Sequence, residues 1–276
     1  MGIKQKKIVG KTLLHLVLLL GAVSQVMPLL WALSTSLLPA NKLLSVMLEL
    51  FTPPFEWSNY LTVFQKVPYL LYYFNSIIVA VFQTLGVILV SSMAAYAFAR
   101  LRFPARDKLF LLYLGTLMIP SQVKMVPTFI SLKLVHLLNS YAALILPGIF
   151  TAFGTFLLRQ FFLTLPKDLE EAALVDGESF FGIFWRIALP LSRPAIATLA
   201  IYSFLQSWND FMWPLIVVSR QELMTIPLGI FSFTQNYMTN WNLMMAAVIL
   251  SIFPVLLVFF FAQKQFIEGI TLTGIK

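Results

Sequence analysis

Long apolar runs alternate with short polar or charged segments along almost the whole chain. A helix of about 20 apolar residues crosses a bilayer, and six runs reach or approach that length. The pattern predicts six membrane-spanning helices, at about 12–38, 71–98, 109–129, 140–162, 194–218 and 243–262. Pro120, Lys124 and Pro127 interrupt the third run near its outer end. Basic residues before the first run also fit a cleaved signal peptide, but the length of that run favours an uncleaved helix.

Composition supports a membrane protein. The 276 residues are 59% hydrophobic and 11% charged, with a mean hydropathy of +0.87, whereas soluble domains have about 45–50% apolar and about 25% charged residues. A chain of this size cannot bury so much apolar surface in water, so the surplus must face lipid. The absence of cysteine excludes disulfide scaffolds and thiolate metal sites. We expect an all-α, polytopic membrane protein that forms one domain over residues 1–276.

The 19 basic residues are unevenly distributed between the two sides of the predicted membrane domain. If both termini are cytoplasmic, 14 of the 19 lie on the cytoplasmic side. The other 5 lie outside and are Lys42, Lys66, Lys124, Lys133 and Arg220. Because cytoplasmic loops are enriched in Lys and Arg, this distribution predicts cytoplasmic N- and C-termini. It also explains the net charge of +8 without a nucleic-acid partner.

The cytoplasmic loop between the fourth and fifth predicted helices, residues 164–193, is unusually acidic. It contains five of the 11 acidic residues, namely Asp168, Glu170, Glu171, Asp176 and Glu178. Such acids do not help a cytoplasmic loop to set topology, so their concentration indicates a folded element. The spacing of Asp168 and Glu171 is typical of a capping box at the start of a helix.

This loop is predicted to form a helical hairpin. A first helix is expected over 169–176, followed by Gly177 at the position after the helix end. A second helix is expected over 180–188, ended by Pro190. The hairpin would either contact a partner protein or lie on the membrane surface as an amphipathic element without a partner.

Seven residues of the same loop have the spacing of a known motif. They are Glu171, Ala172, Ala173, Gly177, Ile187, Leu189 and Pro190. The loop resembles the EAA motif, E-A-A-x3-G-x9-I-x-L-P, of membrane subunits of ATP-binding-cassette importers, and every fixed position agrees. Other segments resemble the carbohydrate branch of that family, in particular the shorter permease of maltose-type importers. They are residues 73–76, 95–103, 208–215 and 269–276.

The resemblance implies a membrane-spanning subunit of an ATP-driven importer in a prokaryotic cell membrane. The implied partners are a second permease subunit, a dimer of ATPase subunits that binds ATP and magnesium, and an extracytoplasmic substrate-binding protein. The substrate would be a sugar or a related polyol, and the chain itself would be neither an enzyme nor a cofactor-binding protein. The motif residues and Asp176 would couple the chain to the ATPase, and residues 268–276 would run between the ATPase subunits.

Asp210 is the acidic residue placed inside a predicted membrane helix, where a charge is a functional candidate by default. Other polar or aromatic side chains could line a path for the substrate or stack on sugar rings. The predicted set is Asn75, Gln83, Tyr202, Gln206, Trp208, Asn209 and Asp210. Structural roles are the alternative: Asp210 as a buried anchor, the amides as hydrogen-bonding groups between helices, and the aromatic residues as packing.

The third outer loop, residues 219–242, is rich in polar and aromatic residues. The resemblance implies that it reaches toward the substrate-binding protein. The candidate contact residues are Thr225, Pro227, Gly229, Phe231 and Asn236. The alternative is an aromatic belt at the membrane interface.

Motifs for ATP binding and catalysis fail in this sequence. Residues 10–12 resemble the end of a P-loop, but Gln5 stands where the first glycine belongs and an apolar span follows. His15 and His136 are isolated, so no metal site is predicted. The competing function is a stand-alone secondary transporter or channel, which would show internal repeats and several intramembrane charges. An intramembrane enzyme would need a polar catalytic cluster that the sequence does not provide.

Overall fold

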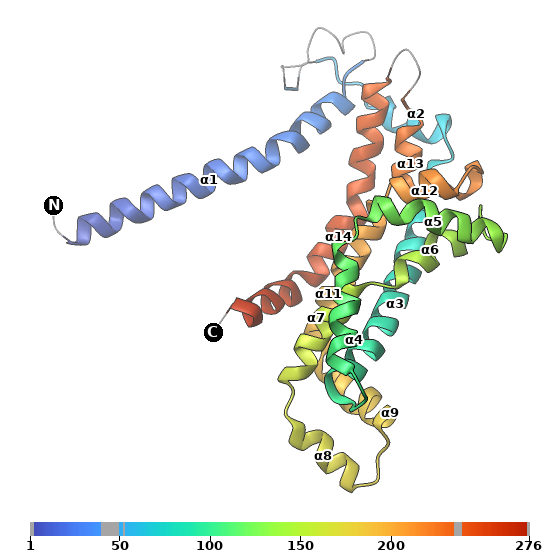
Figure 1. Ribbon diagram of the computed structural model, residues 1–276. Helices are drawn as coiled ribbons and strands as arrows, with labels where there is room; N and C mark the ends of the chain where they lie inside the picture. Colours follow the sequence, from blue (N-terminus) through green and yellow to red (C-terminus); the bar gives the residue numbers. More distant parts are fainter. Residues whose placement is uncertain (1–2, 40–49, 52, 235–238, 275–276) are drawn as a thin grey trace. The chain divides into compact units, whose positions relative to one another are not determined.

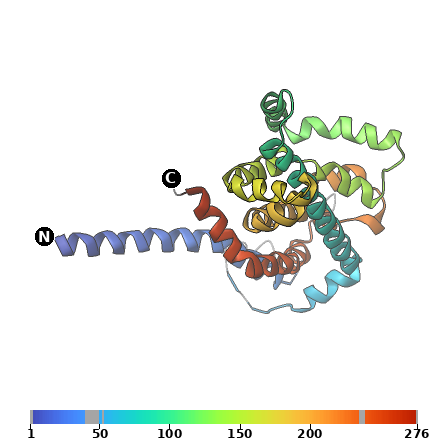
Figure 2. The ribbon, with the colours of Figure 1, turned by 90° about the horizontal axis from the view of Figure 1, so that it is seen from below.

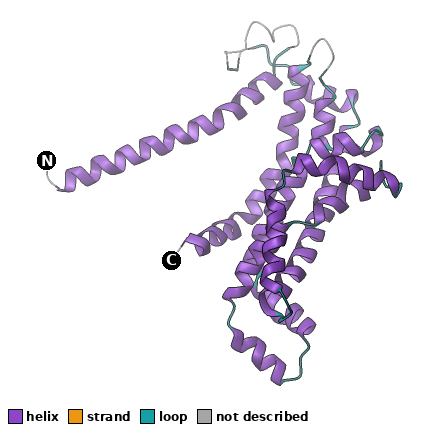
Figure 3. Cartoon of the chain, in the orientation of Figure 1, coloured by secondary structure: helices purple, strands orange, loops and turns teal. Residues whose placement is uncertain are grey.

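The computed structural model describes residues 3–39, 50–51, 53–234 and 239–274, with side chains described for 11–39, 50–51, 53–234 and 239–260. In this part of the chain the regular elements are helices (Figure 3), apart from an isolated antiparallel bridge between Thr234 and Thr239. The all-α prediction is confirmed for these residues.

Three helices are each long and apolar enough to cross a membrane by themselves. They are α1 (Ile3–Ser36), α3 (Tyr69–Arg100) and α14 (Trp241–Gly274) (Figure 1). They correspond to the first, second and sixth predicted spans. Apolar side chains along α1 are exposed, as for Leu13 at 63%. Such a surface is stable only against lipid or another apolar partner.

The remaining candidate spans are pairs of helices with a bend between them. Helix α4 (Arg106–Gly115) continues through a 3-10 turn to Met118 and is bent by 99° from α5 (Ser121–Leu134), as Figure 2 illustrates. A 44° bend separates α6 (Tyr141–Ile149) from α7 (Ala152–Thr164). A 78° bend precedes α11 (Arg193–Trp208). The described residues provide up to six spans if each bent pair counts as one.

Three predicted spans need correction. The fourth, 140–162, consists of two helices separated by the 44° bend. The third, 109–129, is not one helix, because the backbone turns at Ile119 and Pro120, and Pro127 lies inside α5 without ending it. Proline has no N–H and fixes its φ angle, so it suits the start of a new helix. The fifth, 194–218, stops at Trp208, and a separate helix α12 (Met212–Val217) follows.

Shorter helices lie in the connecting segments. Helix α2 (Ser58–Lys66) lies between the first and second predicted spans. The segment predicted as the third outer loop contains η4 (Gln221–Leu223) and α13 (Ile226–Phe231). The inner hairpin contains α8 (Lys167–Val175), α9 (Phe180–Ile183), the π-helical turn η3 (Phe184–Ala188) and α10 (Leu189–Leu191).

The chain divides into two compact units. The first consists of Met1–Tyr69 and Ile230–Phe253. Within it, Asn59 donates from Nδ2 to the carbonyls of Ser36 (2.9 Å) and Leu38 (3.0 Å). Asn59 Oδ1 accepts a hydrogen bond from Asn242 Nδ2 at 3.1 Å. This buried amide pair links the end of α1, α2 and the start of α14.

The second unit consists of Leu70–Gly229 and Pro254–Lys276. Its main core joins α3, α7 and α11 to the second half of the inner hairpin. The Tyr96 ring lies 5.8 Å from the ring of Phe162 and 5.4 Å from that of Phe184. Because Phe184 belongs to the hairpin, this apolar core fixes the hairpin against the long helices.

Candidate functional site: an inner hairpin and a polar cavity

The tip of the inner hairpin is a Schellman turn. Helix α8 ends at Asp176, and Gly177 follows with φ +84°. The Gly177 N–H donates to the Leu174 carbonyl at 3.1 Å, and the Glu178 N–H donates to the Ala173 carbonyl at 2.9 Å. This pair of bonds satisfies the last carbonyls of the helix, and its left-handed residue favours glycine. The predicted role of Gly177 at the helix end is therefore confirmed.

The predicted start of α8 was wrong in one respect. The helix begins at Lys167 after Pro166, and no side chain caps its first turn. Asp168 and Glu171 therefore do not form a capping box. Proline at the N-cap position with φ −59° directs the chain into the helix without such a cap. Asp168 and Glu170 lie in the first turn, where negative charge is favourable.

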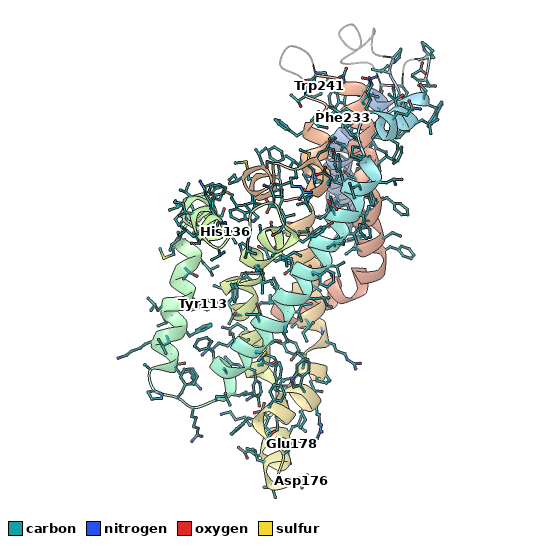
Figure 4. The ribbon with its side chains drawn as sticks, turned by 90° about the vertical axis from the view of Figure 1, so that its right-hand side faces the viewer. Tyr113, His136, Asp176, Glu178, Phe233 and Trp241 are labelled. Carbon is teal, nitrogen blue, oxygen red and sulfur yellow. The ribbon has the colours of Figure 1, made fainter. Side chains whose placement is uncertain are left out.

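The EAA-type residues are divided between two faces of the hairpin. Ala173, Ile187 and Leu189 pack against the main core of the second unit. The other four motif residues, Glu171, Ala172, Gly177 and Pro190, are exposed, as is the neighbouring Asp176. Figure 4 shows Asp176 beside Glu178 at the tip. The small side chain of Ala173 allows the hairpin to pack closely against the core, and the exposed residues are available to a partner protein.

The second half of the hairpin runs further than predicted. Ser179 Oγ accepts from the Gly182 N–H at 3.1 Å and caps α9. The helical path then widens into the π-helical turn and continues through Pro190 to Leu191. Pro190 does not end it, because proline is tolerated in the first turn of α10, where its missing N–H is not needed.

A buried ion pair holds the first turn of α8 against the end of α3. Arg100 Nε lies 2.9 Å from Glu170 Oε1, and the two side chains are 5% and 16% exposed. Arg100 Nη2 also donates to the Leu165 carbonyl at 2.6 Å. Burial raises the pKa of the Glu170 carboxyl, while Arg100 and Lys167 act in the opposite direction by favouring its charged form.

A second arginine strengthens the same end of the unit. Arg159 on α7 donates from Nε to the Phe98 carbonyl at 3.2 Å, and its guanidinium lies 4.1 Å from the centre of the Phe110 ring. Its Nη2 lies 3.3 Å from Asp107 Oδ1. The sequence patterns did not identify either arginine as a site residue, although Arg100 lies within one of the segments that carry the family resemblance.

Two of the seven predicted path residues line one cavity. Gln83 and Asp210 face a cavity of about 230 Å³ beside the break between α11 and α12. Further residues of α5 and α12 complete its polar or aromatic lining, namely Ser121, Lys124, Thr128 and Trp213. Pattern reasoning missed these four, although Lys124 was noted as a charge that interrupts an apolar run.

The other predicted path residues have structural partners. Asn75 is fully buried; its Nδ2 donates to the carbonyls of Glu222 (2.8 Å) and Met224 (2.9 Å), and its Oδ1 accepts from the Tyr141 hydroxyl (2.6 Å). Trp208 is 3% exposed, with its ring 5.7 Å from that of Tyr73. These contacts correspond to the alternative of hydrogen bonding and packing.

Three more of them lie on α11 or at its end. Gln206 Nε2 donates to the Tyr202 hydroxyl at 3.1 Å, one turn away on the exposed face of α11. The ring of Tyr202 lies 4.6 Å from that of Phe153. Asn209 is exposed and donates from Nδ2 to the Leu205 carbonyl at 2.8 Å. None of the three is among the residues that line the cavity.

The candidate binding-protein residues differ in accessibility. Thr225 and Gly229 are buried, and a Cβ on Gly229 would overlap the Tyr72 ring of α3. Pro227 is half-buried and Phe231 is 47% exposed. Asn236 lies outside the described residues.

Comparison with known proteins identifies the chain. Residues 7–271 match the family described as "Binding-protein-dependent transport system inner membrane component". The chain belongs to this family. The resemblance inferred from the EAA-type loop is thus confirmed at the level of the family.

Two individual relatives are similar to this chain over nearly the full length of both proteins. The chain is 38% identical over 252 residues to the arabinooligosaccharides transport system permease protein AraQ of Bacillus subtilis, covering 90% of both chains. It is 36% identical over 264 residues to the sn-glycerol-3-phosphate transport system permease protein UgpE of Yersinia enterocolitica, covering 93% of this chain and 94% of the relative.

A solved structure shares the fold. A chain of a bacterial ABC transporter involved in the import of the acidic polysaccharide alginate superposes with a TM-score of 0.83. The sequence identity is 22%, and the superposition covers 96% of this chain and 98% of the other. The fold of an importer permease is therefore shown for this chain.

Proposed function

We propose that the chain is one of two membrane-spanning subunits of an ATP-driven importer, which translocates a sugar or a related polyol delivered by an extracytoplasmic binding protein. Membership of a binding-protein-dependent transport family supports the dependence on a binding protein. The names of the relatives, which concern arabinooligosaccharides and sn-glycerol-3-phosphate, favour a polyhydroxylated substrate. The subunit lies in the prokaryotic cell membrane with both termini cytoplasmic.

The surface of the inner hairpin carries the proposal. The face of the hairpin that points away from the core combines acidic residues with exposed apolar side chains. Of these, Val175 is 88% exposed and Phe181 is 63% exposed. Apolar residues exposed in this way on an acidic loop are typical of a protein interface. The proposed partner is an ATPase subunit whose cleft receives α8 and whose basic side chain pairs with Glu171. ATP and magnesium bind to that partner.

The contacts of the hairpin suggest how movement of the ATPase subunits is transmitted to the membrane helices. Closure of the two ATPase subunits on ATP moves their clefts, and α8 moves with them. The ion pair of Arg100 with Glu170 transfers this displacement to α3, and the core contacts of Ile187 and Leu189 transfer it to α7 and α11. Because packed cores do not deform continuously, such a displacement favours a switch between two arrangements. The two arrangements expose the path to opposite sides of the membrane.

Reconstitution tests the proposal. The chain is inserted into liposomes with the permease, ATPase and binding protein encoded near its gene, and uptake of radiolabelled sugars and polyols is measured. We expect uptake that requires internal ATP and a loaded binding protein and that stops when the ATPase is omitted. Uptake by the chain alone down an ion gradient would instead establish the stand-alone transporter, and the importer proposal would be abandoned.

A further inference from the structure

The cavity beside the α11–α12 break is built from side chains whose positions are fixed by other contacts. Asp210 Oδ1 accepts from the Trp213 N–H at 3.2 Å and so caps α12. Trp213 is itself held by a hydrogen bond of 2.9 Å from Nε1 to the Ala143 carbonyl. A carboxylate offers about four acceptor positions, so Asp210 retains acceptor capacity beyond its role as a cap.

Gln83 lies on α3, and its side chain is also held in place by other contacts. Its Oε1 accepts from the Ser207 hydroxyl at 3.1 Å, which orients the amide. Gly148 leaves the space that this amide occupies, because a Cβ there would lie 2.1 Å from Gln83 Nε2. Gln83 thus contributes N–H donors to a wall that also contains the hydroxyls of Ser121 and Thr128.

The charges of the cavity indicate the kind of ligand. It contains one carboxylate, Asp210, which is half-buried, and one ammonium, Lys124, which is exposed. Coulomb interactions are stronger away from water, so the carboxylate dominates the inner part of the cavity. A phosphate or carboxylate on a ligand would be repelled there, whereas neutral hydroxyl groups can donate to Asp210 and accept from Gln83.

The size of the cavity restricts the ligand further. Its volume is about 230 Å³, below the ~300–1,000 Å³ typical of sites for drug-sized molecules. We propose that this cavity is a substrate subsite in this permease chain for a single neutral sugar or polyol unit, with Asp210 and Gln83 as its hydrogen-bonding residues and Trp213 as an apolar wall. The inference rests on the proposed import function and assigns part of the substrate recognition to this subunit.

Substitutions can separate binding from the structural role of Asp210. Asparagine caps helices as well as aspartate does, so Asp210→Asn keeps the cap and removes the charge. Gly148→Ala displaces Gln83 into the cavity. Gln160→Ala is the matched control, because this polar residue of α7 is exposed and does not line the cavity.

The experiment measures equilibrium binding to the assembled importer in nanodiscs without its binding protein. The probes are radiolabelled arabinose, maltose and glycerol as neutral ligands, with glucuronate and glycerol 3-phosphate as anions. We expect the wild type and Gln160→Ala to bind at least one neutral probe more tightly than either anion. Asp210→Asn should weaken neutral binding by at least about tenfold, the effect of losing one hydrogen bond to a charged group. Gly148→Ala should weaken it by roughly two- to tenfold, because Gln83 is neutral. Asp210→Asn should also reduce the discrimination against anions.

The subsite would be overturned if no neutral probe bound to the wild type, if anions bound more tightly, or if Asp210→Asn and Gly148→Ala bound as the wild type does. ATP-driven uptake by the wild-type importer with its binding protein is measured in parallel. If wild-type uptake is normal and the variants bind the neutral probes as the wild type does, the subsite is rejected and the import function stands. If the wild-type importer takes up no substrate under any condition, the proposed import function, on which the subsite rests, is rejected.

Discussion

At the scale of single residues, Gly177 is the position where the hairpin depends most directly on residue type. Its φ of +84° lies in the left-handed region, where a residue with a Cβ loses about 1–2 kcal/mol. We expect Gly177→Ala to reduce the population of the formed turn and with it the sugar transported per ATP hydrolysed. The measurement is the ratio of uptake to ATP hydrolysis in the reconstituted importer.

Gly115→Ala is the control for this substitution. Gly115 ends α4 without a positive φ, and nothing lies within 4 Å of a Cβ added there. Alanine is favoured over glycine in a helix by roughly 0.5–1 kcal/mol, so this variant should transport as the wild type does. Equal coupling in both variants would show that the turn at Gly177 is not needed.

Val175 allows a test of the proposed ATPase contact. An aliphatic side chain that is 88% exposed buries little surface within the chain and so contributes little to the stability of the hairpin. If it is buried against an ATPase subunit, Val175→Asp places a charge in that interface and should weaken association by at least about 2 kcal/mol, roughly 30-fold. Co-purification of the ATPase with the tagged permease measures this effect.

Leu134 provides a matched control on α5. It is also an exposed aliphatic residue, at 75%, and lies on the predicted outer side of the membrane. Leu134→Asp should leave ATPase co-purification unchanged. Retention of the ATPase by Val175→Asp would contradict the proposed docking surface.

Residue types in the sequence identified candidate polar groups but not their partners. Asp210 and Gln83 line a cavity, whereas Asn75 and Trp208 are held in hydrogen bonds and ring contacts. The difference depends on which helix faces which, and a single sequence does not contain that information. A charge inside an apolar run was the most informative signal, because burial of a charge requires a specific environment.

At the scale of helices, the pair formed by Arg100 and Glu170 is expected to act as a positioning device between α3 and α8. Removal of one partner from a buried ion pair typically costs about 3–5 kcal/mol, whereas removal of both is often milder. Arg100→Met or Glu170→Met should therefore reduce thermal stability, and the double variant should recover part of it.

The transport assay distinguishes positioning from stability alone. If the pair transfers motion from α8 to α3, the double variant should remain less coupled than the wild type, with ATP hydrolysis retained and uptake per ATP reduced. Glu222→Gln serves as the control, because its pair with Arg220 is exposed on both sides and surface pairs contribute about 0–1 kcal/mol. Full coupling in the stable double variant would limit the pair to a structural role.

The type of the elements was predictable, whereas the predicted number of six spans is reached in the described residues only if each bent pair counts as one. The runs that became α1, α3 and α14 are continuous because their residues permit one unbroken helix. Pro120 lies at the 99° bend before α5, although a single span was predicted across it, and the break after Trp208 has no proline to mark it. There Asp210 accepts from the Trp213 N–H three residues on, which is a local start signal for α12 that the pattern analysis did not use.

At the scale of the whole molecule, the excess of apolar residues required a membrane, and the spacing of seven residues indicated the family that the comparisons confirm. Both features can be recognised without knowledge of the contacts between helices, because one depends on composition and the other on a local motif. The division into two compact units depends on long-range contacts and had no counterpart in the sequence patterns.

The orientation in the membrane is the remaining prediction at this scale, and the lack of cysteine makes it directly measurable. Single cysteines replace Val175 in the inner hairpin and Trp57 in the first outer segment, which are 88% and 66% exposed. Because 14 of 19 basic residues lie on the side of the termini, that side should be cytoplasmic. A membrane-impermeant maleimide should label Trp57→Cys in intact cells and Val175→Cys only after permeabilisation. The reverse pattern would invert the topology and place the hairpin out of reach of any cytoplasmic ATPase.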